Sequence, residues 1–168
     1  GQHMKRATME LGGHAPVIIT GDADIKKAVS VMSASKFRNA GQVCVSPTRF
    51  LVEQNVADEF LDGFTTAAKA IRVGNGLDPE TEMGPLANER RIPALEALIA
   101  DATERGGRLT TGGSRIGNQG NFFAPTVLTD VPDDAMIMTE EPFGPLAPIV
   151  RFSDRDEVIQ RANSLPFG

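Results

Sequence analysis

"NAGQVCVSPTRFLV", residues 39–52, is the stretch in which a helix pattern ends and a strand pattern begins. Gly41 is typical of a residue that stops a helix, and "RFLVE" (49–53) has the apolar run of a buried strand. A strand entered directly from a helix indicates the alternating units of a layered α/β domain. The same stretch contains Cys44, the only cysteine of the chain. This thiol is either a small buried side chain or a nucleophile held at the edge of a sheet.

The segments on either side of this junction continue the alternation. "PVIIT" (16–20) follows a glycine pair and predicts a short buried strand. Asp22 or Asp24 is expected to cap a helix that runs to about Asn39, and Asn55 to cap a second helix. The second helix has the clearest amphipathic spacing of the chain. Its apolar positions are Val56, Phe60, Leu61, Phe64, Ala68 and Ile71.

The rest of the chain, residues 73–168, follows the same pattern. Residues 73–85 are dense in Gly and Pro and predict a loop. A helix is expected over 89–105, and Pro93 must start or kink it because proline lacks the amide proton. A short strand within 106–113, an extended segment at 122–131, a strand at 147–153 and a helix at 155–163 complete the order. Strands alternating with helices predict a layered αβα domain with a largely parallel sheet.

Composition excludes several classes of protein and site. The chain has 168 residues and a net charge of −5, which argues against a nucleic-acid partner. No apolar run approaches the length of a membrane span. One cysteine forms neither an internal disulfide nor a zinc cluster, so we expect no metal and a reducing, cytoplasmic location. Residues 1–4, "GQHM", resemble a tag remnant and are not expected to form part of the fold.

Three short stretches carry residues suited to chemistry. "MELGGHAP" (9–16) places Glu10 before two glycines, which allow another molecule to approach the backbone. "TEEPFGP" (139–145) places an acidic pair before a rigid turn, and Cys44 is the third candidate. Each has an ordinary alternative, because surface Glu residues are mostly solvated and free cysteines are mostly buried.

Taken together, "ELGG", "NAGQVC" and "EEPFGP", in this order and at these separations, resemble the aldehyde dehydrogenase superfamily. The resemblance extends to "DPETEMGPL", "FFAPTVLTDV" and "RANSLPFG", and so to nearly the whole chain after residue 4. It implies that residues 5–168 form the catalytic domain, without the upstream NAD-binding segment and the C-terminal tail. "GGHAP" and "CVSPTRF" resemble members that act on semialdehydes of small carboxylic acids. The chain has Ser46 where some relatives carry a second cysteine.

The resemblance implies two catalytic residues. Cys44 matches the nucleophile that attacks the aldehyde carbon and forms a thiohemiacetal, whose collapse by hydride loss leaves a thioester. The backbone N–H of Cys44 is an expected donor to the developing oxyanion. Glu10 matches the general base that activates water to hydrolyse the thioester, a task that suits a partly buried carboxylate. His14 stands where many members have lysine, and we expect a packed or capping imidazole there.

The resemblance also implies a cofactor, NAD or NADP. Glu141 matches the residue that accepts hydrogen bonds from the nicotinamide ribose, and Phe143 matches a side chain near the nicotinamide ring. Leu11 and Gly12 are expected to offer backbone close to the cofactor. No "GxGxxG" follows a strand, so most of the dinucleotide site is expected upstream. We therefore expect the isolated chain to bind no cofactor and to be inactive, and the full-length protein to be a homo-oligomer that oxidises a small aldehyde.

Two alternatives remain open on the sequence. One is a relative that transfers the acyl group to coenzyme A instead of water, and Glu10 argues against it because that route needs no hydrolytic base. The other is a non-catalytic domain in which Cys44 only packs.

Overall fold

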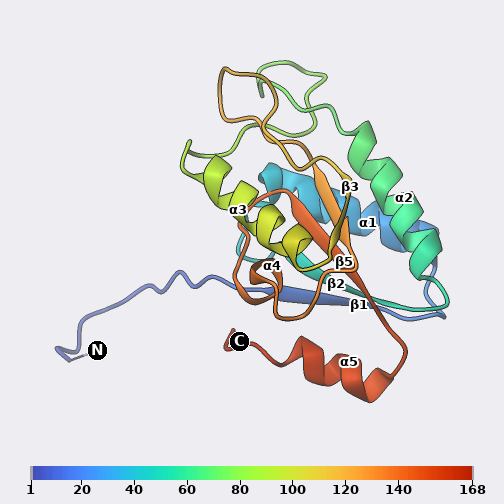
Figure 1. Ribbon diagram of the computed structural model, residues 1–168. Helices are drawn as coiled ribbons and strands as arrows, with labels where there is room; N and C mark the ends of the chain where they lie inside the picture. Colours follow the sequence, from blue (N-terminus) through green and yellow to red (C-terminus); the bar gives the residue numbers. More distant parts are fainter. Residues whose placement is uncertain (1, 168) are drawn as a thin grey trace.

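A five-stranded sheet forms the centre of the computed structural model, which describes residues 2–167 (Figure 1). Gly1, part of the expected tag remnant, and Gly168, the end of the predicted "NSLPFG" turn, lie outside the described residues. The strands, in their order across the sheet, are β1 (Ala15–Ile19), β2 (Pro47–Glu53), β5 (Leu146–Phe152), β4 (Thr126–Thr129) and β3 (Arg108–Thr111).

Three of the four strand pairs are parallel. β1 pairs with β2, β2 with β5 and β5 with β4, all in the same direction, and Phe50 lies opposite Ile149 at the centre. β3 runs antiparallel to β4 at the edge of the sheet. The predicted α/β fold with a largely parallel sheet is confirmed, and the antiparallel edge strand is an addition.

Helices cover both faces of the sheet. α1 (Ile25–Phe37) and α2 (Ala57–Ala70) pack against each other on one face, while α3 (Arg91–Glu104) and the short α4 (Met136–Thr139) lie together on the other (Figure 1). α5 (Arg155–Ala162) follows β5 and lies against it. None of the described helices is long and apolar enough to cross a bilayer.

The helix starts agree with the sequence at two places and differ at one. Asp24 caps α1 by accepting a hydrogen bond from the backbone N–H of Lys27 at 3.0 Å. Pro93 lies in the first turn of α3 and so starts that helix. The prediction that Asn55 caps α2 is wrong, because Val56 is at the cap position and no side chain caps the helix. The Asn55 side chain instead packs against Gly21, where a Cβ would overlap it.

A phenylalanine cluster joins α1, α2 and β2. The ring centroids of Phe50 and Phe64 are 5.0 Å apart, those of Phe60 and Phe64 are 5.4 Å apart, and those of Phe37 and Phe64 are 5.7 Å apart. All four side chains are buried, and each such burial contributes about 1.5–3 kcal/mol. Because Phe37 ends α1 and Phe50 lies within β2, the cluster fixes both ends of the segment that contains Cys44.

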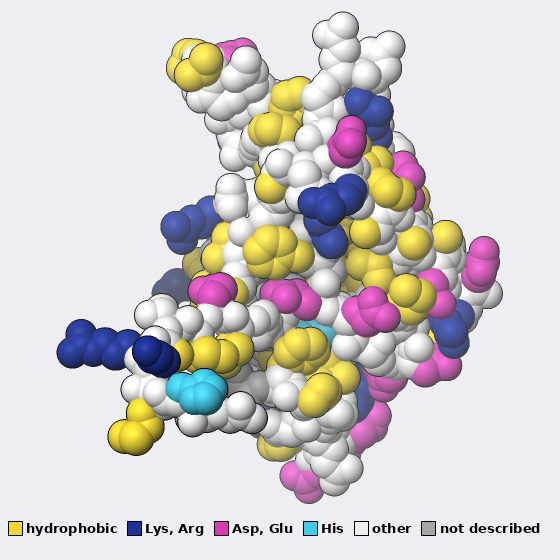
Figure 2. Space-filling model, turned by 90° about the vertical axis from the view of Figure 1, so that its left-hand side faces the viewer, with side chains coloured by type: hydrophobic (Ala, Val, Ile, Leu, Met, Phe, Trp, Pro, Cys, Tyr) yellow, Lys and Arg dark blue, Asp and Glu magenta, His cyan; other side chains and the backbone are white. Residues whose placement is uncertain are grey.

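The surface has no patch of a single charge on the face that Figure 2 presents. Acidic side chains lie scattered there among hydrophobic and basic ones. This distribution accords with the modest net charge of −5.

Candidate active site

Cys44 lies in a turn between the end of α1 and the start of β2. α1 ends at Phe37 and is followed by a 3₁₀ turn, η1 (Arg38–Gly41), with three consecutive residues in the left-handed region. Their φ angles are 51° at Asn39, 54° at Ala40 and 70° at Gly41. The backbone N–H of Ser46 donates to the Val43 carbonyl at 2.9 Å and closes the turn around the half-buried Cys44. The helix-to-strand junction predicted for this thiol is therefore present.

Two neighbouring residues hold this turn in place. The Gln42 side chain is buried, accepts from the backbone N–H of Ala87 at 2.8 Å and donates to the Asn39 carbonyl at 3.0 Å. Gly41 packs so closely against the Gly144 carbonyl that a Cβ would overlap it. An unusual backbone conformation persists only where its surroundings over-determine it. The turn thus depends on loops far away in the sequence.

The loop after α4 brings Glu141 to the glycine pair. The backbone N–H of Gly13 donates to Oε1 of the half-buried Glu141 at 3.2 Å. A Cβ at Gly12 would overlap the same carboxylate. The predicted cofactor residues Gly12 and Glu141 are therefore in contact. Phe143 is 37% exposed and has φ of 38°, a strained value for an aromatic residue that is typical of functional loops.

His14 links three parts of the chain beneath this loop. Its Nε2 lies 3.1 Å from the Ile137 carbonyl, and its Nδ1 lies 2.7 Å from the hydroxyl of Thr48. A carbonyl only accepts, so Nε2 carries the proton, and Nδ1 shares the hydroxyl proton of Thr48 with the Ala15 carbonyl, which lies 3.2 Å from that oxygen. Burial, with a smaller effect of the Arg49 charge, lowers the pKa of His14 to about 4. The ring is neutral at pH 7 and is the packed imidazole that the sequence indicates.

Arg49 is buried and binds only backbone carbonyls. Its Nε and Nη2 donate to the His14 carbonyl at 3.2 and 3.1 Å. Its Nη1 donates to the Arg161 carbonyl at 3.1 Å, and Nη2 also donates to that of Ala162 at 3.0 Å. Burial lowers the pKa of this guanidinium from its ordinary value. Arg49 thus joins the glycine segment to the end of α5.

An open cavity of about 540 Å³ brings Cys44 together with the glycine segment. Of the predicted residues, Cys44, Leu11 and Gly12 line it, whereas Glu10, Glu141 and Phe143 do not. Glu10 is exposed, so the expected partial burial of this carboxylate is not found. The lining residues are Leu11, Gly12, Gly13, His14, Ala15, Pro16, Cys44, Val45, Arg49, Ala162, Asn163 and Phe167.

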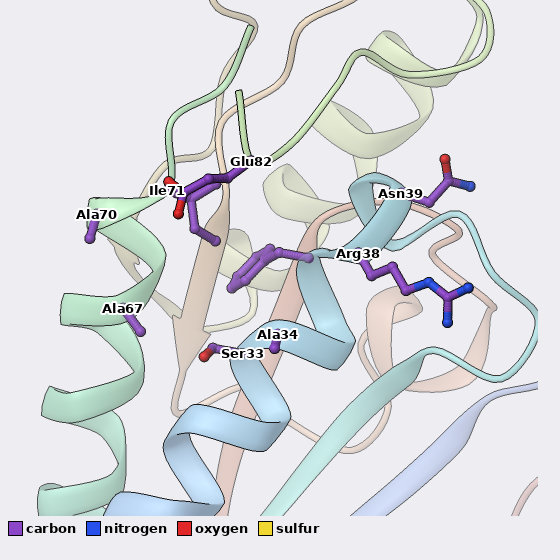
Figure 3. A pocket seen from close by; sticks show the side chains of 9 residues that line it. Ser33, Ala34, Arg38, Asn39, Ala67, Ala70, Ile71 and Glu82 are labelled. Atoms are coloured by element: carbon purple, nitrogen blue, oxygen red, sulfur yellow. The ribbon is translucent and has the colours of Figure 1, made fainter. Parts of the chain in front are cut away.

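A second cavity of about 520 Å³ lies between the ends of α1 and α2 (Figure 3). Figure 3 shows the side chains of Arg38 and Asn39 directed away from α2, so the charged and amide groups do not converge. Cys44 and the glycine segment do not line this cavity. We therefore assign the candidate site to the first cavity, which contains the thiol.

No sequence pattern described above predicts a role for Gln42, Arg49 or Lys36. Lys36 had a readable signal, because it lies four residues after Met32 and 11 after Ile25, on the apolar face of α1. Among residues 2–167, no three His, Cys, Asp or Glu side chains gather in a way that would hold a metal ion.

The chain is similar in sequence to known dehydrogenases. The chain is 50% identical over 167 residues to 4-(hydroxymethyl)benzenesulfonate dehydrogenase of Comamonas testosteroni, covering 99% of this chain and 34% of that protein. It is 47% identical over 165 residues to the NADP(+) succinate-semialdehyde dehydrogenase of Escherichia coli K12, covering 98% and 34%. The chain therefore spans about a third of the length of the curated relatives that it matches.

Solved structures and the family profile agree as well. The crystal structure of succinate-semialdehyde dehydrogenase from Burkholderia pseudomallei superposes with a TM-score of 0.96 at 44% identity, over 99% of this chain and 35% of that one. The sequence profile of the aldehyde dehydrogenase family matches residues 1–168. On this match, and on a fold that such enzymes share, the chain belongs to the aldehyde dehydrogenase family.

Proposed function

We propose that this chain is the catalytic portion of a longer NAD(P)-dependent aldehyde dehydrogenase, which oxidises an aldehyde to a carboxylic acid. The observation that carries the proposal is the position of Cys44. Cys44 is half-buried and lines an open cavity of about 540 Å³, whose lining also includes Gly12 and Gly13. A thiol used only for packing needs no such opening.

Cys44 acts as the nucleophile. Its thiolate adds to the aldehyde carbon, a C–S bond forms, and the carbonyl oxygen becomes an oxyanion. Within residues 2–167 the backbone N–H of Cys44 has no hydrogen-bond partner, so it is free to donate to that oxyanion. When the oxyanion collapses to a carbonyl, the hydride leaves the carbon and a thioester remains on the sulfur.

Glu10 acts as the base for hydrolysis. It removes a proton from water, the hydroxide oxygen adds to the thioester carbon, and the C–S bond breaks to return the Cys44 thiolate. Glu10 is exposed, and it lies only four residues before the anchored His14. Because His14 is fixed, Glu10 cannot lie far from it. This is consistent with a base that acts on water near the cavity.

Glu141 and the glycine pair suit the ribose end of a nicotinamide nucleotide. A carboxylate accepts two hydrogen bonds from neighbouring hydroxyls, and a side chain at Gly12 would fill the space beside it. Phe143, exposed and nearby in sequence, offers an apolar surface for the ring. A bound nicotinamide would supply the acceptor for the hydride that leaves the substrate carbon. The remainder of the dinucleotide would be held by parts of the longer protein.

The substrate we propose is a semialdehyde, an aldehyde that also carries an acidic group. The name of one similar protein, a succinate-semialdehyde dehydrogenase, supports this class, and the name of another, a (hydroxymethyl)benzenesulfonate dehydrogenase, supports the acidic group. Arg49 is the charged residue in the wall of the cavity, and its donors are occupied by carbonyls. The group that binds the substrate anion is therefore expected elsewhere in the longer protein. Cytoplasmic location and homo-oligomer assembly remain predictions.

The test uses the longer protein with Cys44→Ala. We expect NAD(P)H formation to fall to background because no thiohemiacetal forms, while Ser35→Ala, an exposed change on α1, leaves turnover intact. Brief iodoacetamide treatment of the native 168-residue chain should give one adduct, at Cys44. Labelling that requires urea would favour the packing alternative, and a coenzyme A thioester product would favour the acyl-transfer alternative.

A further inference from the structure

Phe143 has a backbone conformation that needs support from the rest of the fold. Its φ of 38° lies in the left-handed region, which is unfavourable for a bulky side chain. Such a conformation persists only where the surrounding structure over-determines it. The side chain is 37% exposed, so the packing of the ring gives only part of that support. The rest is expected to act on the backbone of residues 142–144.

Helix α3 supplies a hydrogen bond to the peptide group directly before Phe143. Nη2 of Arg91, the first residue of α3, donates to the Pro142 carbonyl at 2.5 Å. That carbonyl and the Phe143 N–H belong to one planar peptide unit. The angle φ of Phe143 is the rotation between this unit and the Cα of Phe143, so a fixed Pro142 carbonyl restrains that angle. Because the donor is charged, the bond is of the stronger kind.

The same helix also supports the residue after Phe143. Leu95 lies one turn after Arg91, on the same face of α3, and is fully buried. Its side chain packs so closely on Gly144 that a Cβ there would overlap it. The backbone is thus held on both sides of Phe143, by a hydrogen bond at position 142 and by packing at position 144.

No ion pair accounts for the position of the Arg91 side chain. Within residues 2–167, no carboxylate lies within 4.0 Å of its guanidinium. Its Nε is buried and has no hydrogen-bond partner in the same part of the chain. Arginine normally keeps its charged head in water, and a buried donor without a partner is unfavourable and requires an explanation. The hydrogen bond to Pro142 is the polar contact that this arrangement gains.

We propose that Arg91 is a positioning residue for Phe143, and that its hydrogen bond to the Pro142 carbonyl keeps the Phe143 backbone left-handed and so directs the ring towards the nicotinamide. This inference rests on the proposed function, because the contact of Phe143 with the nicotinamide does. Without that bond, the peptide unit between residues 142 and 143 can rotate and Phe143 can adopt an ordinary negative φ. Arg91 does not line the cavity of Cys44, so it acts through the loop.

The first test follows the Phe143 backbone by NMR in the 168-residue chain, labelled with ¹³C-phenylalanine. The one-bond Cα–Hα coupling differs between left-handed and ordinary conformations, and the Phe143 signal is identified by its absence in Phe143→Leu. In Arg91→Met, the ratio of left-handed to ordinary φ should fall about tenfold or more, the factor that corresponds to one hydrogen bond to a charged group. Arg90→Met, an exposed neighbour, is the matched control and should leave the coupling unchanged.

A role of Arg91 in stability alone would give a different result. The free energy of unfolding would then fall in Arg91→Met, but the folded chain would keep its left-handed Phe143. An unchanged coupling in Arg91→Met, or an equal change in Arg90→Met, would therefore overturn the proposal. Should Arg91→Met not fold, Arg91→Gln takes its place with the same expected result, because its amide is too short to reach the Pro142 carbonyl.

The second test measures the Kd of NAD(P) by calorimetry in the longer protein. Arg91→Met should raise this Kd about fivefold, the size expected of one aromatic contact. In a Phe143→Ala background there is no ring to position, so Arg91→Met should add less than a twofold change. Arg90→Met should leave the Kd unchanged in either background.

The outcomes distinguish this inference from the proposed function. If Phe143→Ala leaves the Kd unchanged, the proposed role of Phe143 fails and the inference fails with it. If Phe143→Ala raises the Kd while Arg91→Met changes neither the coupling nor the Kd, only the role of Arg91 fails. If Arg91→Met raises the Kd equally in both backgrounds, its effect does not pass through Phe143 and the inference is wrong.

Discussion

Cys44 and Glu10 differ in how firmly the fold holds them. Cys44 lies in a turn fixed by Gln42, by the contact of Gly41 with Gly144 and by the start of β2. Glu10 lies on an exposed extended segment before the first strand. A nucleophile must meet the aldehyde carbon in one geometry, whereas a base that acts through water tolerates a longer reach. The difference in anchoring matches the difference in task.

The role of Glu10 predicts a separation of two kinetic steps. In the longer protein, Glu10→Gln should leave hydride transfer almost unchanged and slow thioester hydrolysis by about 10²–10⁴-fold. Stopped-flow measurement of NAD(P)H would then show a rapid burst followed by a slow phase. Glu59→Gln, an exposed change on α2, should show neither effect. Steady-state turnover that stays intact in Glu10→Gln from pH 6 to 9 would remove Glu10 from the mechanism.

At the level of elements, the turn η1 decides where the thiol lies. Gly41→Ala would place a methyl group against the Gly144 carbonyl in a residue with φ of 70°. Such strain costs about 1–3 kcal/mol, so the free energy of unfolding in urea should fall by that amount. The rate of Cys44 labelling should change as well, because the turn must shift. Gly76→Ala, where the added Cβ meets no atom within 4 Å, is the matched control, and equal effects of the two changes would contradict this account.

The elements also show what the sequence could reveal. The spacing of apolar residues predicted α2, and the Asp24 cap of α1 was visible because both signals are local. α4 was missed because four residues are too few to display a helical period. The antiparallel direction of β3 was missed because it depends on the path of the chain between strands. Likewise, residue type alone made Cys44 a candidate, whereas the carbonyl contacts of Arg49 can be seen only in the three-dimensional structure.

For the whole molecule, His14 makes stability depend on pH. The native pKa is about 4 and the ordinary value is 6.5, so between these pH values the unfolded chain binds a proton that the native chain does not. Stability is therefore full above pH 6.5 and is lost as the pH falls towards 4, by about 3 kcal/mol in all. Urea unfolding from pH 4 to 7 should show this loss. Lys36 acts in the same direction at higher pH, raising stability between about pH 7 and 10.5.

A pair of histidine variants isolates the effect. His14→Gln keeps an amide donor for the Ile137 carbonyl but removes the titration, so the loss of stability between pH 6.5 and 4 should shrink by most of its size. His3→Gln, in the exposed N-terminal segment, should preserve the full loss. If the free energy of unfolding depends on pH identically in both variants, groups other than His14 cause the loss of stability in acid.

Because of the Arg49 contacts, substitutions in α5 and changes in its length should have different effects on the fold. Arg49 recognises the carbonyls of residues 161 and 162, which every amino acid possesses, and ignores their side chains. The hydrogen bonds of Arg49 to α5 therefore do not depend on which side chains stand at these two positions. An inserted or deleted residue in α5 would instead rotate other carbonyls into place by about 100° of helical phase. We expect relatives of this chain to keep the length of α5 constant.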